Sequence, residues 1–151
     1  MREILFRGEY TETGDWVKGF YVRLHDDKGN ESHRIYPGYA ETDCGDYYPD
    51  FYEVDPATVG QFTGLTDKNG KKIFEGDIVR GRHWTSYNDK KPEDFHLWRV
   101  DWSEKSGLIT FVDSPTTKAI MSIHDFADFG EVEVIGNIHD NPELLGGAED
   151  G

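Results

Sequence analysis

The sequence has little of what stabilises secreted proteins or places a chain in a membrane. Cys44 is the single cysteine in 151 residues, so no disulfide can form within the chain. The first residues, MREILFRGEY, are too polar for a signal peptide, and no later stretch is apolar enough to span a membrane. We therefore expect a soluble protein in the reducing cytoplasm of a cell.

Basic residues are scarce as well. There are 16 Lys and Arg against 30 Asp and Glu, and the formal net charge is −14. A field of that sign repels nucleic-acid phosphates and anionic lipids, so we expect neither nucleic acid nor a membrane as a direct partner. The acidic residues are spread along the chain, and their simplest role is solubility. A second role stays open, in which carboxylates at phosphate-like spacing imitate nucleic acid on a basic partner.

Motifs for catalysis are missing. There is no Gly-x-Ser-x-Gly turn for a nucleophile, and the glycines lie between predicted strands rather than in a phosphate-binding loop before a helix. Cys44 has Asp43 and Asp46 close by, and neighbouring carboxylates disfavour the reactive thiolate. We predict no catalytic residue, no cofactor and no enzymatic activity.

A group of His and Asp residues in the last third of the chain comes nearest to a metal site, because both residue types bind divalent cations. Its spacing matches no known metal-binding loop, and acidic residues are abundant everywhere. We therefore predict no bound metal, and a metal-dependent hydrolase built on His124, Asp128 and His139 is the last of the alternatives. The whole group consists of His124, Asp125, Asp128, His139 and Asp140.

Aromatic residues, by contrast, make up 14% of the chain and recur at alternate positions between turn-forming pairs. Such alternation is typical of β-strands. Trp16, Phe20, Val22 and Leu24 share one face of a predicted strand that ends at a turn over 26–30. Further strands are expected over 4–6, 33–36, 52–54, 59–65, 71–74, 78–82, 95–102, 108–112 and 132–135.

These elements predict a mainly β fold with minor α content, namely a small SH3-like or partly open barrel core with hairpins and one or two short helices. Asn141, Pro142 and Glu143 supply an N-cap, a first-turn proline and a first-turn acid for one such helix. The length fits one domain, which we place over residues 1–145, with a disordered tail at 146–151.

One segment, 37–52, departs from the alternation. It mixes turn-forming residues with carboxylates and aromatic rings, and we expect an irregular loop or insertion there. Aromatic residues, tyrosine among them, are enriched where proteins contact each other. Tyr47, Tyr48, Phe51 and Tyr52 are therefore the candidate residues for a protein–protein contact.

The glycines that follow have a structural role. Gly60, Gly64, Gly70 and Gly76 are expected to hold turns, and Gly70 belongs to an Asn-Gly pair that favours a tight hairpin. Asp77 follows Gly76 at a corner, where its carboxylate can accept hydrogen bonds from the amides of the turn.

The longest specific pattern covers residues 54–79, VDPATVGQFTGLTDKNGKKIFEGDIV, and resembles the signature of the YopX family of phage and prophage proteins. Residues 1–8 and 16–19 resemble the start of that family and 134–145 its end, so the resemblance spans nearly the whole chain. It implies a bacterial or phage origin, a place in the cytoplasm of the bacterial host and a mainly β fold. It supplies no catalytic residues, since no biochemical activity is established for the family and a shared fold does not imply one.

We therefore expect a phage or prophage accessory protein that acts by binding a host or phage protein and by self-association as a homo-oligomer. The aromatic segment, the sheet edges that need covering and the lack of a catalytic pattern support this expectation. The main alternative is an acidic nucleic-acid mimic that regulates a nucleic-acid-binding protein of the host.

Overall fold

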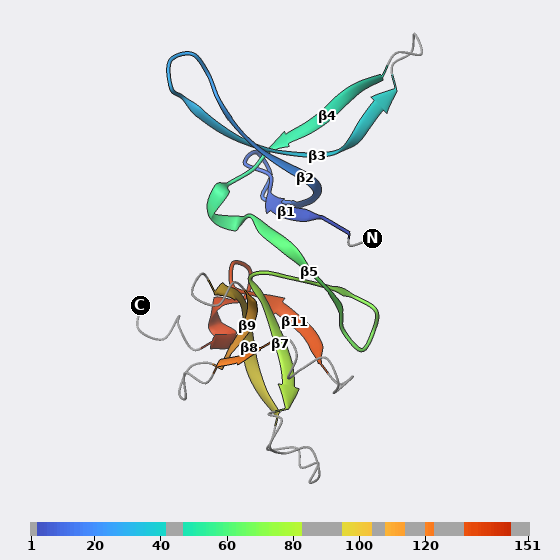
Figure 1. Ribbon diagram of the computed structural model, residues 1–151, viewed down its shortest axis with the longest axis vertical. Coiled ribbons are helices and arrows are strands. Elements are labelled where there is room, and N and C mark those ends of the chain that lie inside the picture. The colour runs from blue at the N-terminus through green and yellow to red at the C-terminus, as the bar shows by residue number, and fades with distance from the viewer. Residues whose placement is uncertain are drawn as a thin grey trace. The chain divides into compact units, whose positions relative to one another are not determined.

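The computed structural model of the chain (Figure 1) describes residues 3–41, 47–82, 95–103, 108–113, 120–122 and 132–145. The chain divides into two compact units, Met1–Phe62 and Thr63–Gly151. Antiparallel strands dominate the described elements, which confirms the mainly β prediction. The sheets of the described residues are open and do not close into a barrel. The prediction of one domain over 1–145 stays a prediction.

The first unit is an antiparallel sheet in which β1, β2 and β3 are neighbours. In spatial order its strands are β4 (Tyr47–Glu53), β3 (Glu31–Glu41), β2 (Trp16–His25), β1 (Phe6–Glu9) and the start of β5 (Gly60–Thr66). In Figure 1, β2 and β3 form a long hairpin whose turn is drawn in blue. This hairpin is the one that the alternating apolar residues predict.

The turn between β2 and β3 is fixed by one carboxylate. Asp26 accepts hydrogen bonds from the backbone N–H groups of Lys28 at 2.9 Å and Asn30 at 2.8 Å. The side chain and backbone of Asn30 are the main reason that the pKa of Asp26 lies below its ordinary value. The resulting register places Phe20 directly opposite Tyr36, so their side chains lie on the same face of the sheet.

The predicted irregular loop over 37–52 is corrected by the structure. The chain continues as strands β3 and β4, and only residues 42–46 of the segment lie outside the described part. The β3–β4 ladder shifts its register beside Pro37 and Gly38, as at a β-bulge, which accommodates the turn-forming pair. Pro49 lies in β4, the edge strand of this sheet, where a missing N–H is tolerated.

The core of the first unit lies on the face of β3 that carries Ile35. Ile35 is fully buried, and Val54 and Phe62 are almost so. Between β4 and β5 the chain forms a 3₁₀ turn, η1 (Pro56–Thr58), for which Asp55 is the N-cap. Thr58 Oγ1 accepts the Glu9 N–H at 2.9 Å and thereby ties η1 to β1.

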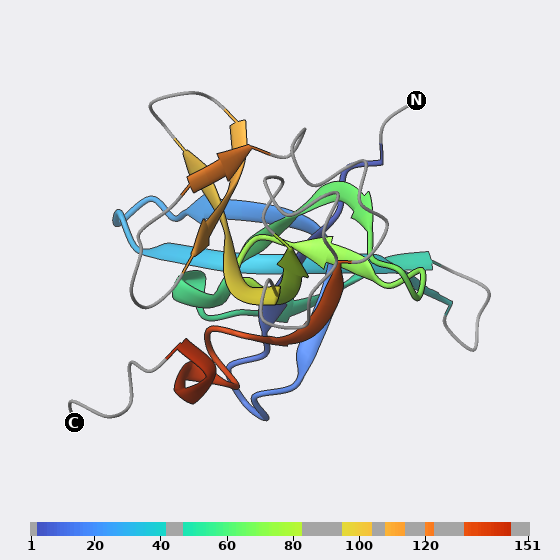
Figure 2. The same ribbon diagram turned by 90° about the horizontal axis from the view of Figure 1, so that it is seen from below.

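The second unit contains a five-stranded antiparallel sheet in the order β10-β9-β8-β7-β11. The end of β5 pairs with β6, and η4 follows β11 at the position predicted for a short helix. These elements are β6 (Lys72–Phe74), β7 (Asp77–Arg82), β8 (Phe95–Ser103), β9 (Leu108–Asp113), β10 (Ile120–Ser122), β11 (Glu133–Asn137) and the 3₁₀ helix η4 (Pro142–Leu145). Figure 2 shows the same strands from below.

The core of the second unit is built around Trp98. Its ring is fully buried, and its Nε1–H donates to the carbonyl oxygen of Gly81 at 3.2 Å, so burial leaves no indole donor unpaired. Trp98 packs with a cluster of buried aliphatic side chains. The cluster consists of Ile73, Val79, Val100 and Val132, with Leu65 and Val134 at its margin.

The glycines expected in turns fall into two groups. Gly70 and Gly76 lie in turns with φ of 80° and 88°, the left-handed region that favours glycine. Gly64 also has a positive φ, 90°, but it lies inside β5, and Gly60 is the first residue of β5. Gly60 and Gly64 therefore lie in a strand rather than in a turn, and Gly64 has a backbone conformation that glycine adopts without strain.

Two buried aspartates organise the corners of the second unit. The Asp77 carboxylate is 1% exposed and accepts the Phe74 N–H at 2.8 Å, as a corner residue of this kind is expected to do. Asp67 accepts N–H groups from Asn69 at 2.8 Å, Lys71 at 2.9 Å and Val134 at 3.0 Å. Asp67 therefore closes the β5–β6 hairpin and joins it to β11.

Candidate functional site

The four predicted contact residues all belong to β4, and the structure describes the side chains of two of them. The side chains of Tyr47 and Tyr48 lie outside what the structure describes. Phe51 is 41% exposed, whereas the ring of Tyr52 packs edge-on against Tyr10 with ring centroids 4.9 Å apart. Consecutive residues of a strand point to opposite faces, so Phe51 and Tyr52 cannot contact the same partner surface.

Phe51 instead joins residues from β2 and β3 to make the strongest candidate surface. We call the set Phe20, Arg34, Tyr36 and Phe51 the Arg34 face. Phe20 is 66% exposed and lies across the ladder from Tyr36. The rings of Tyr36 and Phe51 are 5.5 Å apart, and the guanidinium carbon of Arg34 lies 4.3 Å from the centre of the Phe51 ring. Three strands thus present aromatic rings and a cation together.

An exposed aromatic ring that contacts a second ring, as Phe51 contacts Tyr36, differs from a single apolar residue on a surface. A scattered exposed Phe is normal, but a contiguous group with an arginine has the composition that protein interfaces favour. The sequence placed Phe20 on an apolar face of its strand and did not mark it as a contact residue. Alternation shows which residues share a face of the sheet, but it does not show which of the two faces is covered by other residues. For this reason the exposure of Phe20 could not be predicted.

The opposite face of the same hairpin carries a polar network centred on Glu31. Tyr21 Oη and His33 Nδ1 are 2.5 Å apart, and His33 Nε2 lies 2.9 Å from a Glu31 oxygen. His25 Nε2 lies 3.1 Å from the other oxygen, and Arg23 donates to Glu31 as well. The Arg23 hydrogen bond is the main cause that holds the pKa of Glu31 below its ordinary value. Burial raises the pKa of Tyr21. Since these groups bind one another across β2 and β3, the network braces the hairpin.

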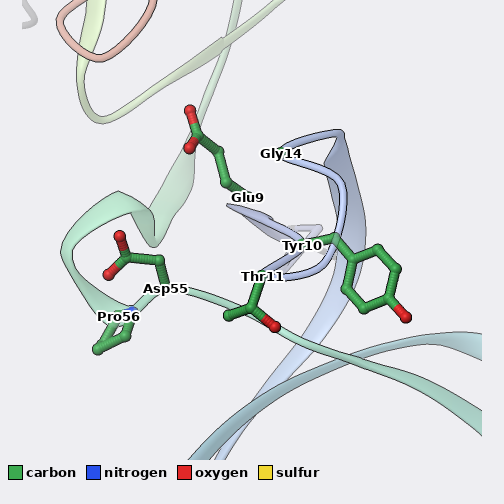
Figure 3. A pocket seen from close by; sticks show the side chains of 6 residues that line it. All are labelled: Glu9, Tyr10, Thr11, Gly14, Asp55 and Pro56. Carbon is green, nitrogen blue, oxygen red and sulfur yellow. The ribbon is translucent and has the colours of Figure 1, made fainter.

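A shallow pocket of about 340 Å³ lies between the β1–β2 turn and η1 (Figure 3). Figure 3 shows the ring of Tyr10 turned away from Asp55, which stands with Pro56 on the other side. Tyr10 Oη donates to Glu12 at 2.7 Å, and this bond is the main reason that the pKa of Tyr10 is raised. The Asp55 carboxylate already caps η1 through the N–H of Ala57. The Asp55 carboxylate and the Tyr10 hydroxyl of the pocket are thus both engaged in local hydrogen bonds. Its lining consists of Glu9, Tyr10, Thr11, Gly14, Asp55 and Pro56.

The candidate metal ligands fall only partly within the described residues. His124, Asp125 and Asp128 lie outside them. His139 and Asp140 lie in the turn after β11, where the backbone N–H groups of both donate to the Asn137 side-chain oxygen at 2.9 Å. Among the residues that the structure describes, no three His, Cys, Asp or Glu side chains are grouped to hold a metal ion. No helix in this described part is long and apolar enough to cross a membrane.

Comparisons with known proteins place the chain in a family. The family model described as YopX protein matches residues 5–146. The structure of protein EF1440 from Enterococcus faecalis is similar to this one, with 24% identity, a TM-score of 0.56 and coverage of 96% of this chain and 99% of that one. Protein YopX from Bacillus subtilis is also similar, with 17% identity, a TM-score of 0.52 and coverage of 96% and 97%. No curated protein matches the chain. Since the family model covers nearly the whole sequence, as the motif at 54–79 predicts, the chain belongs to the YopX family.

Proposed function

We propose that this protein is a phage or prophage accessory protein that acts by binding proteins rather than by catalysis, and that it associates with itself through the Arg34 face. The observation that carries the proposal is the exposure of Phe20 and Phe51 in one group with Tyr36 and Arg34. Membership of the YopX family supports the phage origin.

The face is a better contact surface than the strand edge beside it. β4 is the edge strand of the first unit, and Pro49 removes one backbone donor from it. Asp50 and Glu53 are exposed on the same strand, so two copies that paired edge to edge would bring carboxylates together. Proline and charge are the usual means by which edge strands avoid such pairing. Association of two copies therefore favours the aromatic face.

Burial of the two rings supplies only part of the energy that association needs, so the loss of either ring should be felt. Full burial of one phenylalanine side chain stabilises by about 1.5–3 kcal/mol, and Phe20 and Phe51 are already partly covered. A symmetric dimer makes each contact twice, which doubles the gain. Because association itself costs at least about 4 kcal/mol, removal of either ring should shift the equilibrium strongly towards monomer.

Sedimentation velocity from micromolar to millimolar protein tests the proposal. We expect wild type to sediment as an oligomer at high concentration and Phe20→Ser as a monomer with an unchanged circular dichroism spectrum. Trp102→Ser is the matched control, since Trp102 is 46% exposed in β8 of the other unit, and it should associate like wild type. A wild-type protein that stays monomeric throughout this range would refute the self-association that we propose.

A further inference from the structure

The guanidinium of Arg34 is held in place by the residues of its own face. It lies 4.3 Å from the centre of the Phe51 ring, a cation–π distance, and its Nη1 reaches Tyr36 Oη at 3.5 Å. Stacking on a ring fixes the plane of a guanidinium and leaves its N–H groups available at the edges of that plane. The group is therefore preorganised before any partner binds.

The hydrogen-bonding capacity of Arg34 is largely unused. A guanidinium carries five N–H donors. The contact with Tyr36 Oη is at the limit of hydrogen-bond length, and Arg34 Nε is buried without an acceptor among the described residues. Glu53 is the cross-strand neighbour of Arg34, yet the two form no ion pair in the part of the chain that the structure describes. Arg34 as a whole is half-buried, so its terminal Nη groups are the donors that remain open to an acceptor from outside the chain.

We infer that Arg34 determines the specificity of the self-association proposed above, and that it binds a carboxylate of a second copy of this chain. A carboxylate is the acceptor that matches the planar fork of arginine with two parallel hydrogen bonds. The chain carries 30 acidic against 16 basic residues, so a second copy offers more carboxylates than cations to an incoming Arg34. The exposed ring of Phe51 lies against the guanidinium and would exclude water from one side of the pair, as apolar neighbours do around interface arginines.

Charge gives a second reason for this assignment. Two chains of net charge −14 repel each other, so they associate only where a positive group meets the acidic surface of the other. Arg34 supplies such a group beside the exposed ring of Phe51. The inference rests on the proposed self-association and adds the chemical group that completes the contact.

Dissociation constants from sedimentation equilibrium, measured for wild type and for substitutions of this one residue, test the inference. We expect Arg34→Gln to weaken association about 30-fold or more, as at an interface hot spot. Arg34→Lys keeps the charge over Phe51 but lacks the fork, and we expect it to weaken association about tenfold. Arg80→Gln is the control, because Arg80 is an exposed arginine in β7 of the other unit, and it should change the constant less than twofold.

Salt provides a readout that a purely structural role of Arg34 would not change. Added NaCl screens both the repulsion between two chains of net charge −14 and the ion pair of Arg34, which have opposite effects on affinity. We expect Arg34→Gln to gain more affinity from added NaCl than wild type does, since that variant has no ion pair to lose. If wild type associates and both Arg34 variants match it in affinity and salt response, the carboxylate contact is overturned while self-association stands. If wild type does not associate, both the inference and the proposed function fail. Urea unfolding of each variant separates loss of folding from loss of contact.

Discussion

Replacement of Gly19 by alanine should damage the hairpin that carries the Arg34 face. A Cβ at Gly19 would lie 2.3 Å from the carbonyl oxygen of Tyr36 and 2.8 Å from Pro37 Cα, and both atoms belong to the backbone of the neighbouring strand. An ordinary contact needs about 1 Å more, so β2 and β3 must separate and lose ladder hydrogen bonds there. Overpacking of this kind destabilises by about 1–3 kcal/mol. We expect the upper part of that range, because backbone cannot rotate away as a side chain can.

Gly38→Ala is the control for the Gly19 substitution. Gly38 lies in the adjacent strand β3, and a Cβ there would meet nothing within 4 Å. Alanine at such a position leaves stability unchanged or raises it by up to about 1 kcal/mol, because the unfolded chain loses entropy. Urea unfolding followed by tryptophan fluorescence measures both variants, with Trp16 as a reporter within β2. Equal midpoints for the two variants would show that the strands do not approach each other as described.

Two further predictions concern the second unit. Gly76→Val places a β-branched residue at φ 88°, in a corner where the Gly76 N–H donates to the Val100 carbonyl and the Gly76 carbonyl accepts the Ile138 N–H. We expect the free energy of unfolding to fall by about 2–3 kcal/mol, seen as a lower thermal midpoint. An unchanged midpoint would contradict the corner geometry. Burial alone would raise the pKa of Asp67, but the N–H groups of Val134, Lys71 and Asn69 outweigh it and hold that pKa below its ordinary value. The ionised Asp67 carboxylate therefore stabilises the folded state fully at pH values above the pKa of an aspartate in the unfolded chain, about 3.9. This stabilisation is lost as the pH falls through the lower pKa of Asp67 in the folded state. Urea unfolding at pH 7 should show Asp67→Asn to be about 2 kcal/mol less stable than wild type. This difference should shrink below about pH 4. A difference that is constant with pH would refute the stabilising role of the Asp67 charge.

Most strands could be predicted from local signals in the sequence, because each signal follows from one physical rule. Alternation over residues 16–24 identified β2, and the Asn69–Gly70 pair identified the hairpin after β5. The same rules failed over 37–52, where turn-forming residues outnumber other signals. A bulge and an edge strand absorb such residues, and both depend on pairing with a distant strand that the local sequence does not report.

The candidate site was harder to predict than the strands, for a related reason. Trp98 and Trp102 are four residues apart in β8, so alternation assigns them to one face, yet Trp98 is fully buried and Trp102 is 46% exposed. Phe20 likewise has the pattern of a core residue and is exposed. Alternation assigns a residue to a face, whereas exposure depends on what packs against that face. Arg34 carries no sequence signal at all, since its role comes from the register that brings Phe51 beside it.

The hydrogen bonds of Asp67 also have a consequence for synthesis on the ribosome. The Asn69 and Lys71 amides lie 2 and 4 residues after Asp67, but the Val134 amide lies 67 residues later. At a translation rate of about 5–20 residues per second, the nascent hairpin waits about 3–13 s for its last donor. During that interval the Asp67 carboxylate accepts hydrogen bonds only from the nearby amides, and β11 then supplies the Val134 N–H. The order of translation therefore makes the β5–β6 hairpin an early element whose final stability comes with the end of the chain.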